Sequence, residues 1–299
     1  MDDEQATHRL GLLITFMGVL VLSPDTLLLR MIGQEGGESS WTINFWRGLF
    51  QSTGMMVVFA AMHGRGALRA TFAVGPWGLF ASLLFGGQAL CFVFSVGNTL
   101  VANTLVIIAT APFFSALFAW IFLRERAPKR TWIAILCACG GIAVIFSGSL
   151  GSGNLAGDLA ALATAVGLGA GFVIVRHRRS VNMVPSMALG ALLAALVSFP
   201  QADPFSLTTT GFGLMAFLGL VMLPVAFTLI TLGPRYLPAP EVSLLLLLET
   251  VLGPFLVWLF LDETPDGLAL LGGGIVVTTL LLHSLAGWRA MARREAVRV

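Results

Sequence analysis

One carboxylate lies in the middle of an otherwise apolar stretch, and it is the residue of this sequence best placed for chemistry. The stretch runs from Leu237 to Thr264 and can cross a bilayer, whose core of about 30 Å needs roughly 20 helical residues. From Ala239 to Glu249 the rise is about 15 Å, which places Glu249 near the midplane. An ionisable group there is costly unless it is neutralised, paired or bathed by a polar cavity. We therefore expect Glu249 to bind a substrate or a proton, or else to accept hydrogen bonds between helices.

A second candidate is an ion pair between Asp25 and Arg47, which both fall in the outer third of their apolar segments. Its functional interpretation is an outer gate, or a site where Arg47 binds a substrate carboxylate. Its structural interpretation is a clamp between two helices, because removing one partner of a buried pair is costly. Ser23 and Pro24 precede Asp25 and predict that this helix is bent or broken.

Neutral side chains complete the predicted cavity. Gln88 and Thr110 lie at a similar membrane depth to Glu249, with Pro112 close to Thr110. They could bind a zwitterionic substrate, or they could only form hydrogen bonds between helices. Phe92 and Phe227 could line the cavity, although packing or lipid contact is the more common role in a chain with 22 phenylalanines.

Composition sets the class of protein. Of 299 residues, 57% are hydrophobic and only 11% are charged, which indicates a polytopic membrane protein. The net charge of +2 gives no reason to invoke nucleic acid. We expect no cofactor, no metal site and no catalytic residues, because there is no ATP-binding loop, no clustering of histidines or cysteines, and no nucleophile with a base at membrane depth.

The fold predicted is an all-α integral membrane protein with ten transmembrane helices. The apolar segments of spanning length are 10 to 29, 41 to 62, 77 to 97, 100 to 123, 131 to 148, 157 to 175, 184 to 200, 210 to 232, 239 to 261 and 267 to 286.

The distribution of Lys and Arg orients these segments, because basic residues accumulate on cytoplasmic loops. With both termini cytoplasmic, 15 of the 17 basic residues fall inside, while Arg30 lies outside and Arg47 within a helix. The inside residues are Arg9, Arg65, Arg69, Arg124, Arg126, Lys129, Arg130, Arg176, Arg178, Arg179, Arg235, Arg289, Arg293, Arg294 and Arg298.

The chain also contains an internal repeat. A shift of 138 residues aligns Trp120–Glu125 with Trp258–Glu263, each at the end of the fourth helix of a five-helix half. Because five is odd, the halves, residues 1–150 and 151–299, sit oppositely in the membrane. Such inverted repeats are typical of secondary transporters, whose substrate site lies between the halves.

These residues resemble the drug/metabolite transporter superfamily, in the branch of two EamA-type repeats. The resemblance rests on Ala111-Pro112 followed by Trp120–Glu125, on Gly157-Asp158-Leu159, on Glu249 to Glu263, and on Arg47. Members of that branch often carry Glu-Pro in helices four and nine, so that each half here keeps one residue of the pair. Thr250 departs from the pattern, which makes local unwinding beside Glu249 harder to predict.

Within the superfamily the chain is most similar to the YddG-type amino-acid exporters. The resemblance implies export of amino acids, aromatic ones included, or of related small metabolites across a bacterial inner membrane. The expected partners are a small-molecule substrate and the bilayer; the oligomeric state stays open, and a monomer is compatible with these features. The alternatives are a drug or organic-cation exporter, whose substrate would suit a lone carboxylate among aromatic rings, and, from other classes, a lipid-modifying intramembrane enzyme or a channel.

Overall fold

A computed structural model describes residues 2–36, 39–98, 104, 107–146, 155–261 and 267–296. Within these ranges every regular element is helical and no strand occurs, as the sequence predicted. In chain order the elements are α1 (Asp2–Leu22), α2 (Asp25–Gly36), α3 (Ser40–His63), η1 (Gly64–Gly66), α4 (Ala67–Phe72), α5 (Gly75–Asn98), α7 (Ala111–Leu123), α8 (Lys129–Phe146), α9 (Leu155–His177), α10 (Val184–Ser198), η2 (Phe199–Gln201), α11 (Thr209–Phe217), η3 (Leu218–Met222), α12 (Leu223–Tyr236), α13 (Ala239–Leu246), α14 (Glu249–Leu261) and α15 (Gly267–Ala296).

Several predicted spans are made of more than one helix. The segment 10 to 29 is divided into α1 and α2 at Ser23 and Pro24, which confirms the predicted break. The segment 210 to 232 contains α11, the π-helical turn η3 and α12, with Pro224 directly after the wide turn. Because proline has no backbone N–H and clashes with the preceding turn, a local change of helical pitch there is expected.

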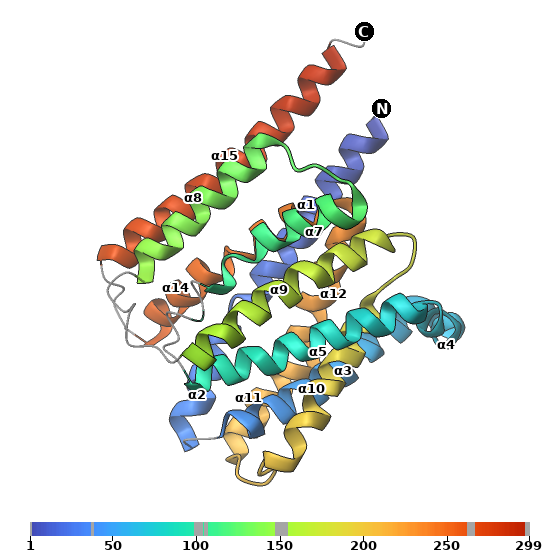
Figure 1. Ribbon diagram of the computed structural model, residues 1–299. Helices are drawn as coiled ribbons and strands as arrows, with labels where there is room; N and C mark the ends of the chain where they lie inside the picture. The colour runs from blue at the N-terminus through green and yellow to red at the C-terminus, as the bar shows by residue number, and fades with distance from the viewer. Residues whose placement is uncertain are drawn as a thin grey trace.

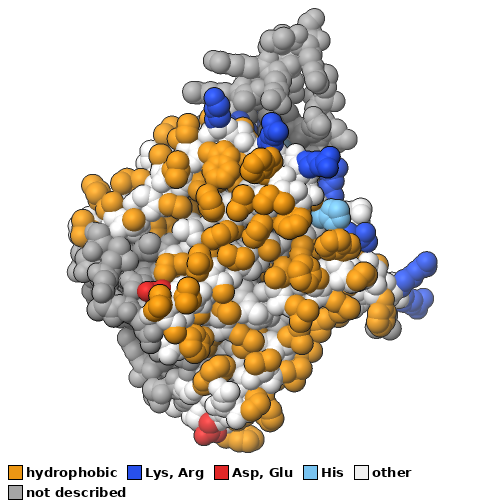
Figure 2. Space-filling model, in the orientation of Figure 1, with side chains coloured by type: hydrophobic (Ala, Val, Ile, Leu, Met, Phe, Trp, Pro, Cys, Tyr) orange, Lys and Arg blue, Asp and Glu red, His pale blue; other side chains and the backbone are white. Residues whose placement is uncertain are grey.

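Among the described residues, five helical stretches are long and apolar enough to cross a membrane, at 6–29, 75–95, 155–177, 184–201 and 209–236. Large hydrophobic side chains are exposed along α1, α5, α8 and α15, and hydrophobic side chains cover the broad middle of the surface in Figure 2. In water such a surface would aggregate, whereas lipid accommodates it. The chain is therefore a multi-pass membrane protein, and the count of ten spans stays a prediction.

Close helix contacts build the interior. Three glycines of α9 face its neighbours: a Cβ on Gly167 would lie 3.0 Å from Gln88 Cβ, one on Gly169 2.8 Å from the Ser115 nitrogen, and one on Gly171 2.6 Å from the Phe85 ring. Small residues allow such approach between membrane helices. In Figure 1, α8 and α15 lie side by side, and the start of α1 and the end of α15 lie at the same end of the molecule.

Candidate functional site

Helix breaks lie directly before the residues that the sequence singled out. Leu247 and Leu248 form a turn between α13 and α14, and Glu249 is the first residue of α14. Ala109 and Thr110 form a turn before α7, which begins at Ala111. A break in the helix beside Glu249 therefore occurs as a tight turn, although Thr250 stands where the related family often has proline.

The two breaks correspond residue by residue at the register of 138. Helices α7 and α14 both have 13 residues, and Ala111 and Leu123 align with Glu249 and Leu261. The tight backbone hydrogen bonds also recur: Thr110 N donates to Ile107 O at 3.0 Å and Leu248 N to Leu245 O at 3.1 Å, while Phe113 N donates to Thr110 O at 2.9 Å and Val251 N to Leu248 O at 3.1 Å. The same backbone device thus occurs twice, once before an alanine and once before a glutamate. Residues 99–103 and 105–106, which belong to the predicted fourth span, and Glu263 of the aligned motif lie outside the described residues.

Asp25, Arg47 and Glu249 form a charged group, here named the Glu249 cluster. Arg47 Nη2 donates to Asp25 Oδ2, so the predicted ion pair is present. Glu249 interacts electrostatically with both residues, and α14 packs against α2, whose first residue is Asp25. Two carboxylates therefore begin two half-helices, where the positive end of the helix dipole favours an acid, and they outnumber the single guanidinium of the cluster.

Unused hydrogen-bonding capacity remains in this cluster. Asp25 is 6% exposed, and its Oδ1 atom is buried without a hydrogen-bond partner, as is Arg47 Nε. The carboxylate of Glu249 makes no hydrogen bond or ion pair within the described part of the chain, and the residue is partly exposed. Buried polar groups are normally satisfied. With two acids and one base, the cluster has chemistry suited to a proton or a cationic group.

The other predicted residues have hydrogen-bond and packing partners of their own. Gln88 packs against α9, where Thr164 Oγ1 donates to its backbone oxygen at 3.3 Å, and its own Oε1 is buried and unpartnered. Thr110 and Pro112 lie at the break before α7, with Thr110 Oγ1 donating to Ile107 O at 2.6 Å. Phe92 and Phe227 are partly buried on α5 and α12, and Phe227 packs against two core clusters. The structure therefore joins Asp25, Arg47 and Glu249, and among the described residues no hydrogen bond or ion pair joins them to the remaining candidates.

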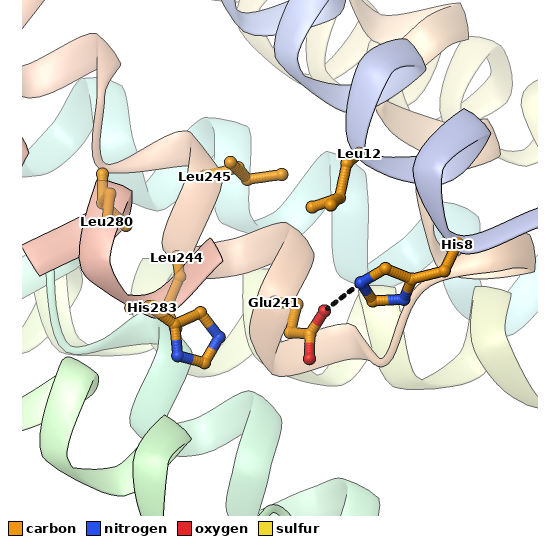
Figure 3. Close-up of a pocket in the computed structure, with 7 residues that line it drawn as sticks. All are labelled: His8, Leu12, Glu241, Leu244, Leu245, Leu280 and His283. Carbon is orange, nitrogen blue, oxygen red and sulfur yellow. Dashed lines mark ion pairs between the residues drawn. The ribbon is translucent and has the colours of Figure 1, made fainter. Parts of the chain in front are cut away.

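A second buried acid was not predicted to be functional. Glu241 is 7% exposed and lies in a small cavity with His8 and His283. Figure 3 shows His8 on α1 directed at the Glu241 carboxylate, 3.6 Å from Nε2 to Oε2, and Arg130 Nη2 lies 4.0 Å from Oε1. We name His8, Arg130, Glu241 and His283 the Glu241 cluster. The signal in the sequence was a second carboxylate in the same apolar segment, eight residues before Glu249.

No group of three or more His, Cys, Asp or Glu side chains able to hold a metal ion occurs among the described residues.

Broken helices with charged residues at the breaks, in a multi-pass α-helical membrane protein, define the class of membrane transporters. The sequence pattern of the EamA-like transporter family matches residues 9–147 and 155–285, and the chain belongs to that family. This confirms the resemblance to the drug/metabolite transporters at the level of the superfamily.

Relatives of known name are transporters. The chain is 27% identical to the uncharacterized transporter YwfM of Bacillus subtilis, over 67% of this chain and 69% of that protein. It is 23% identical to the pseudopaline exporter CntI of Pseudomonas aeruginosa, over 77% and 82%, and 24% identical to the S-adenosylmethionine uptake transporter of Rickettsia felis, over 99% of both. A solved crystal structure that is 17% identical superposes with a TM-score of 0.78 over 92% of this chain and 97% of its own, which shows the shared fold. A transporter role follows from the family and these relatives.

Proposed function

We propose that this protein is a secondary transporter that exports amino acids or related small metabolites bearing an amino group, by alternating access around Glu249. Its ten spans form two inverted repeats, residues 1–150 and 151–299, with both termini in the cytoplasm. The alternation of basic residues supports this topology, and so does Figure 2, where Lys and Arg side chains gather along one margin of the molecule while hydrophobic side chains cover its middle.

The observation that carries the proposal is the Glu249 cluster at the starts of two half-helices. An amino acid presents an ammonium group and a carboxylate, which complement Glu249 and Arg47 respectively. Asp25 holds Arg47 in place through its ion pair. Gln88, Thr110, Pro112, Phe92 and Phe227 complete the cavity in the state that binds substrate, and the membrane is the bacterial inner membrane.

The relatives include one exporter and one uptake transporter by name, so the direction of transport is part of the proposal. A second candidate is export of organic cations, and the excess of one carboxylate over the single guanidinium in the Glu249 cluster favours it.

Counterflow in proteoliposomes tests both. The panel contains neutral amino acids, the amines obtained by removing their carboxylate, and a quaternary ammonium ion, with and without a proton gradient. We expect saturable counterflow of the amino acids, and loss of nearly all transport in Glu249→Gln. Asp203→Asn is the matched control, since Asp203 is exposed in a loop and its carboxylate accepts from Phe205 N at 3.3 Å, within the same loop.

Three outcomes would redirect the proposal. Equal transport of the amines would favour the cation exporter. Conductance without saturation would indicate a channel. Unchanged transport in Glu249→Gln would remove this residue from the site.

A further inference from the structure

Helix α13 is enclosed over nearly its whole length. It has eight residues, and the seven from Ala239 to Leu245 are all buried. It contacts α7, α9, α1, α12 and α8. In the proposed topology α13 is the cytoplasmic half of its span, and Glu249 lies just beyond its end. The path from the cytoplasm to Glu249 is therefore filled by α13 and its neighbours.

Polar contacts join α13 to the first half of the chain at two positions along the helix. At its start, Glu241 faces His8 of α1 at 3.6 Å and Arg130 of α8 at 4.0 Å. Further along the helix, Ser243 Oγ and Ser115 Oγ of α7 share a hydrogen bond of 2.6 Å, and both serines are buried. Every one of these partners belongs to residues 1–150, whereas α13 belongs to the second repeat.

Similar links surround this end of the molecule. Arg176 of α9 lies 3.3 Å from Glu125, which follows α7, and Arg130 Nη1 donates to the Ala286 oxygen of α15 at 3.2 Å. Both join the two halves. Because the Glu125 side chain is 40% exposed, this pair contributes little, and the more buried Glu241 cluster is the stronger link at this end.

The turn at Leu247 and Leu248 separates α13 from α14, so α13 can tilt without carrying Glu249 with it. A short half-helix that ends in a tight turn, where Leu248 N donates to Leu245 O at 3.1 Å, can move about that turn, because hinge residues often lie at the ends of elements. Resting on the proposed function, we propose that α13 is the cytoplasmic gate, held shut by the Glu241 cluster and by the Ser115–Ser243 bond, and that it opens by tilting at Leu247–Leu248.

Cysteine accessibility tests this gate without any substrate. In a background with Cys91, Cys137 and Cys139 replaced by Ala, Glu249→Cys reports access to the site. The probe is the membrane-impermeant trimethylammonium-ethyl methanethiosulfonate, added to inside-out vesicles, which present the cytoplasmic face. Because Glu241→Gln removes the charge that holds His8 and Arg130, we expect it to speed labelling at least about tenfold.

A cross-link supplies the opposite perturbation. Ser115→Cys and Ser243→Cys together are expected to form a disulfide on oxidation that slows labelling at least about tenfold, with recovery in dithiothreitol. The matched control is Asn44→Cys with Ser198→Cys, since Asn44 Nδ2 donates to Ser198 Oγ at 2.8 Å between α3 and α10, at the opposite end in the proposed topology. This control disulfide should leave cytoplasmic labelling unchanged.

Each result decides the proposal. Labelling unaffected by the disulfide between positions 115 and 243, or accelerated by Glu241→Gln only in right-side-out vesicles, would overturn it. If Glu241→Gln reduces expression, His8→Gln and Arg130→Gln provide the same loosening, and Thr250→Cys is a second reporter. Absence of counterflow would overturn the proposed function. The labelling rates would still test the gate, because they are measured without substrate.

Discussion

The ion pair between Asp25 and Arg47 gives the sharpest test of how charge is held inside this protein. Asp25 is 6% exposed, and the Arg47 side chain is 17% exposed. Arg47→Met keeps most of the side-chain volume and leaves the Asp25 carboxylate buried without its cation. Removing one partner of a buried pair costs about 3–5 kcal/mol. For a chain of this size that corresponds to a fall in melting temperature of about 6–20 °C.

The double variant Asp25→Asn with Arg47→Met removes both charges, so it should recover most of the stability lost in Arg47→Met. Melting followed by size-exclusion fluorescence in detergent compares the wild type, Asp25→Asn, Arg47→Met and the double variant. If Arg47→Met melts no lower than the double variant, the carboxylate does not depend on Arg47 and the reasoning fails. Transport then separates the two interpretations of the pair: a structural clamp predicts that the stable double variant still transports, whereas a gate or substrate site predicts that it does not.

Three further predictions follow from packing and exposure. Gly48→Ala would place a Cβ 2.5 Å from the Ala191 oxygen and should destabilise by about 1–3 kcal/mol, whereas Gly140→Ala, with nothing within 4 Å, should not; melting temperatures compare the two. Asn44→Ala removes the buried bond to Ser198 and should cost about 1 kcal/mol, while Asn98→Ala, exposed and bonded to Phe94 O of its own helix, should cost less by the same measurement. Leu136→Asp, at a side chain 68% exposed on α8, should raise the free energy of membrane insertion by about 3 kcal/mol, whereas Phe205→Asp, 94% exposed in a loop, should insert normally. A glycosylation-based assay measures the insertion of both variants. Equal insertion would argue that α8 does not face lipid.

Local signals explain what the sequence could predict. Apolar runs give the helices, because backbone groups in lipid must bond within a segment. Pro24 predicts the division between α1 and α2, since proline cannot donate in a helix interior. Asp25 and Arg47 are opposite charges at similar depth in adjacent segments, and neither is tolerable alone at that depth, so their pairing could be anticipated.

Tertiary contacts explain what the sequence could not predict. The break at Leu247 and Leu248 has no proline within it, and leucine is a good helix former, so no local preference marks it. Glu241 also looks ordinary in sequence, as an acid in a first helical turn. Its importance arises because α1 and α8 bring His8 and Arg130 to it, and those contacts join segments far apart in the chain.

The breaks before α7 and α14 share their hydrogen-bond pattern but differ in the residue that follows them. The shared pattern is therefore a requirement of the fold, and the residue that differs is a requirement of the site. Matching tight turns before Ala111 and Glu249 show that the break occurs with or without a charged residue after it. The carboxylate is therefore not needed to form the break. It occupies only one copy, where α2 supplies Asp25 and α3 supplies Arg47 as electrostatic partners. A symmetric backbone thus carries an asymmetric charge, and Glu249→Gln should alter transport while leaving the turn at Leu247–Leu248 intact.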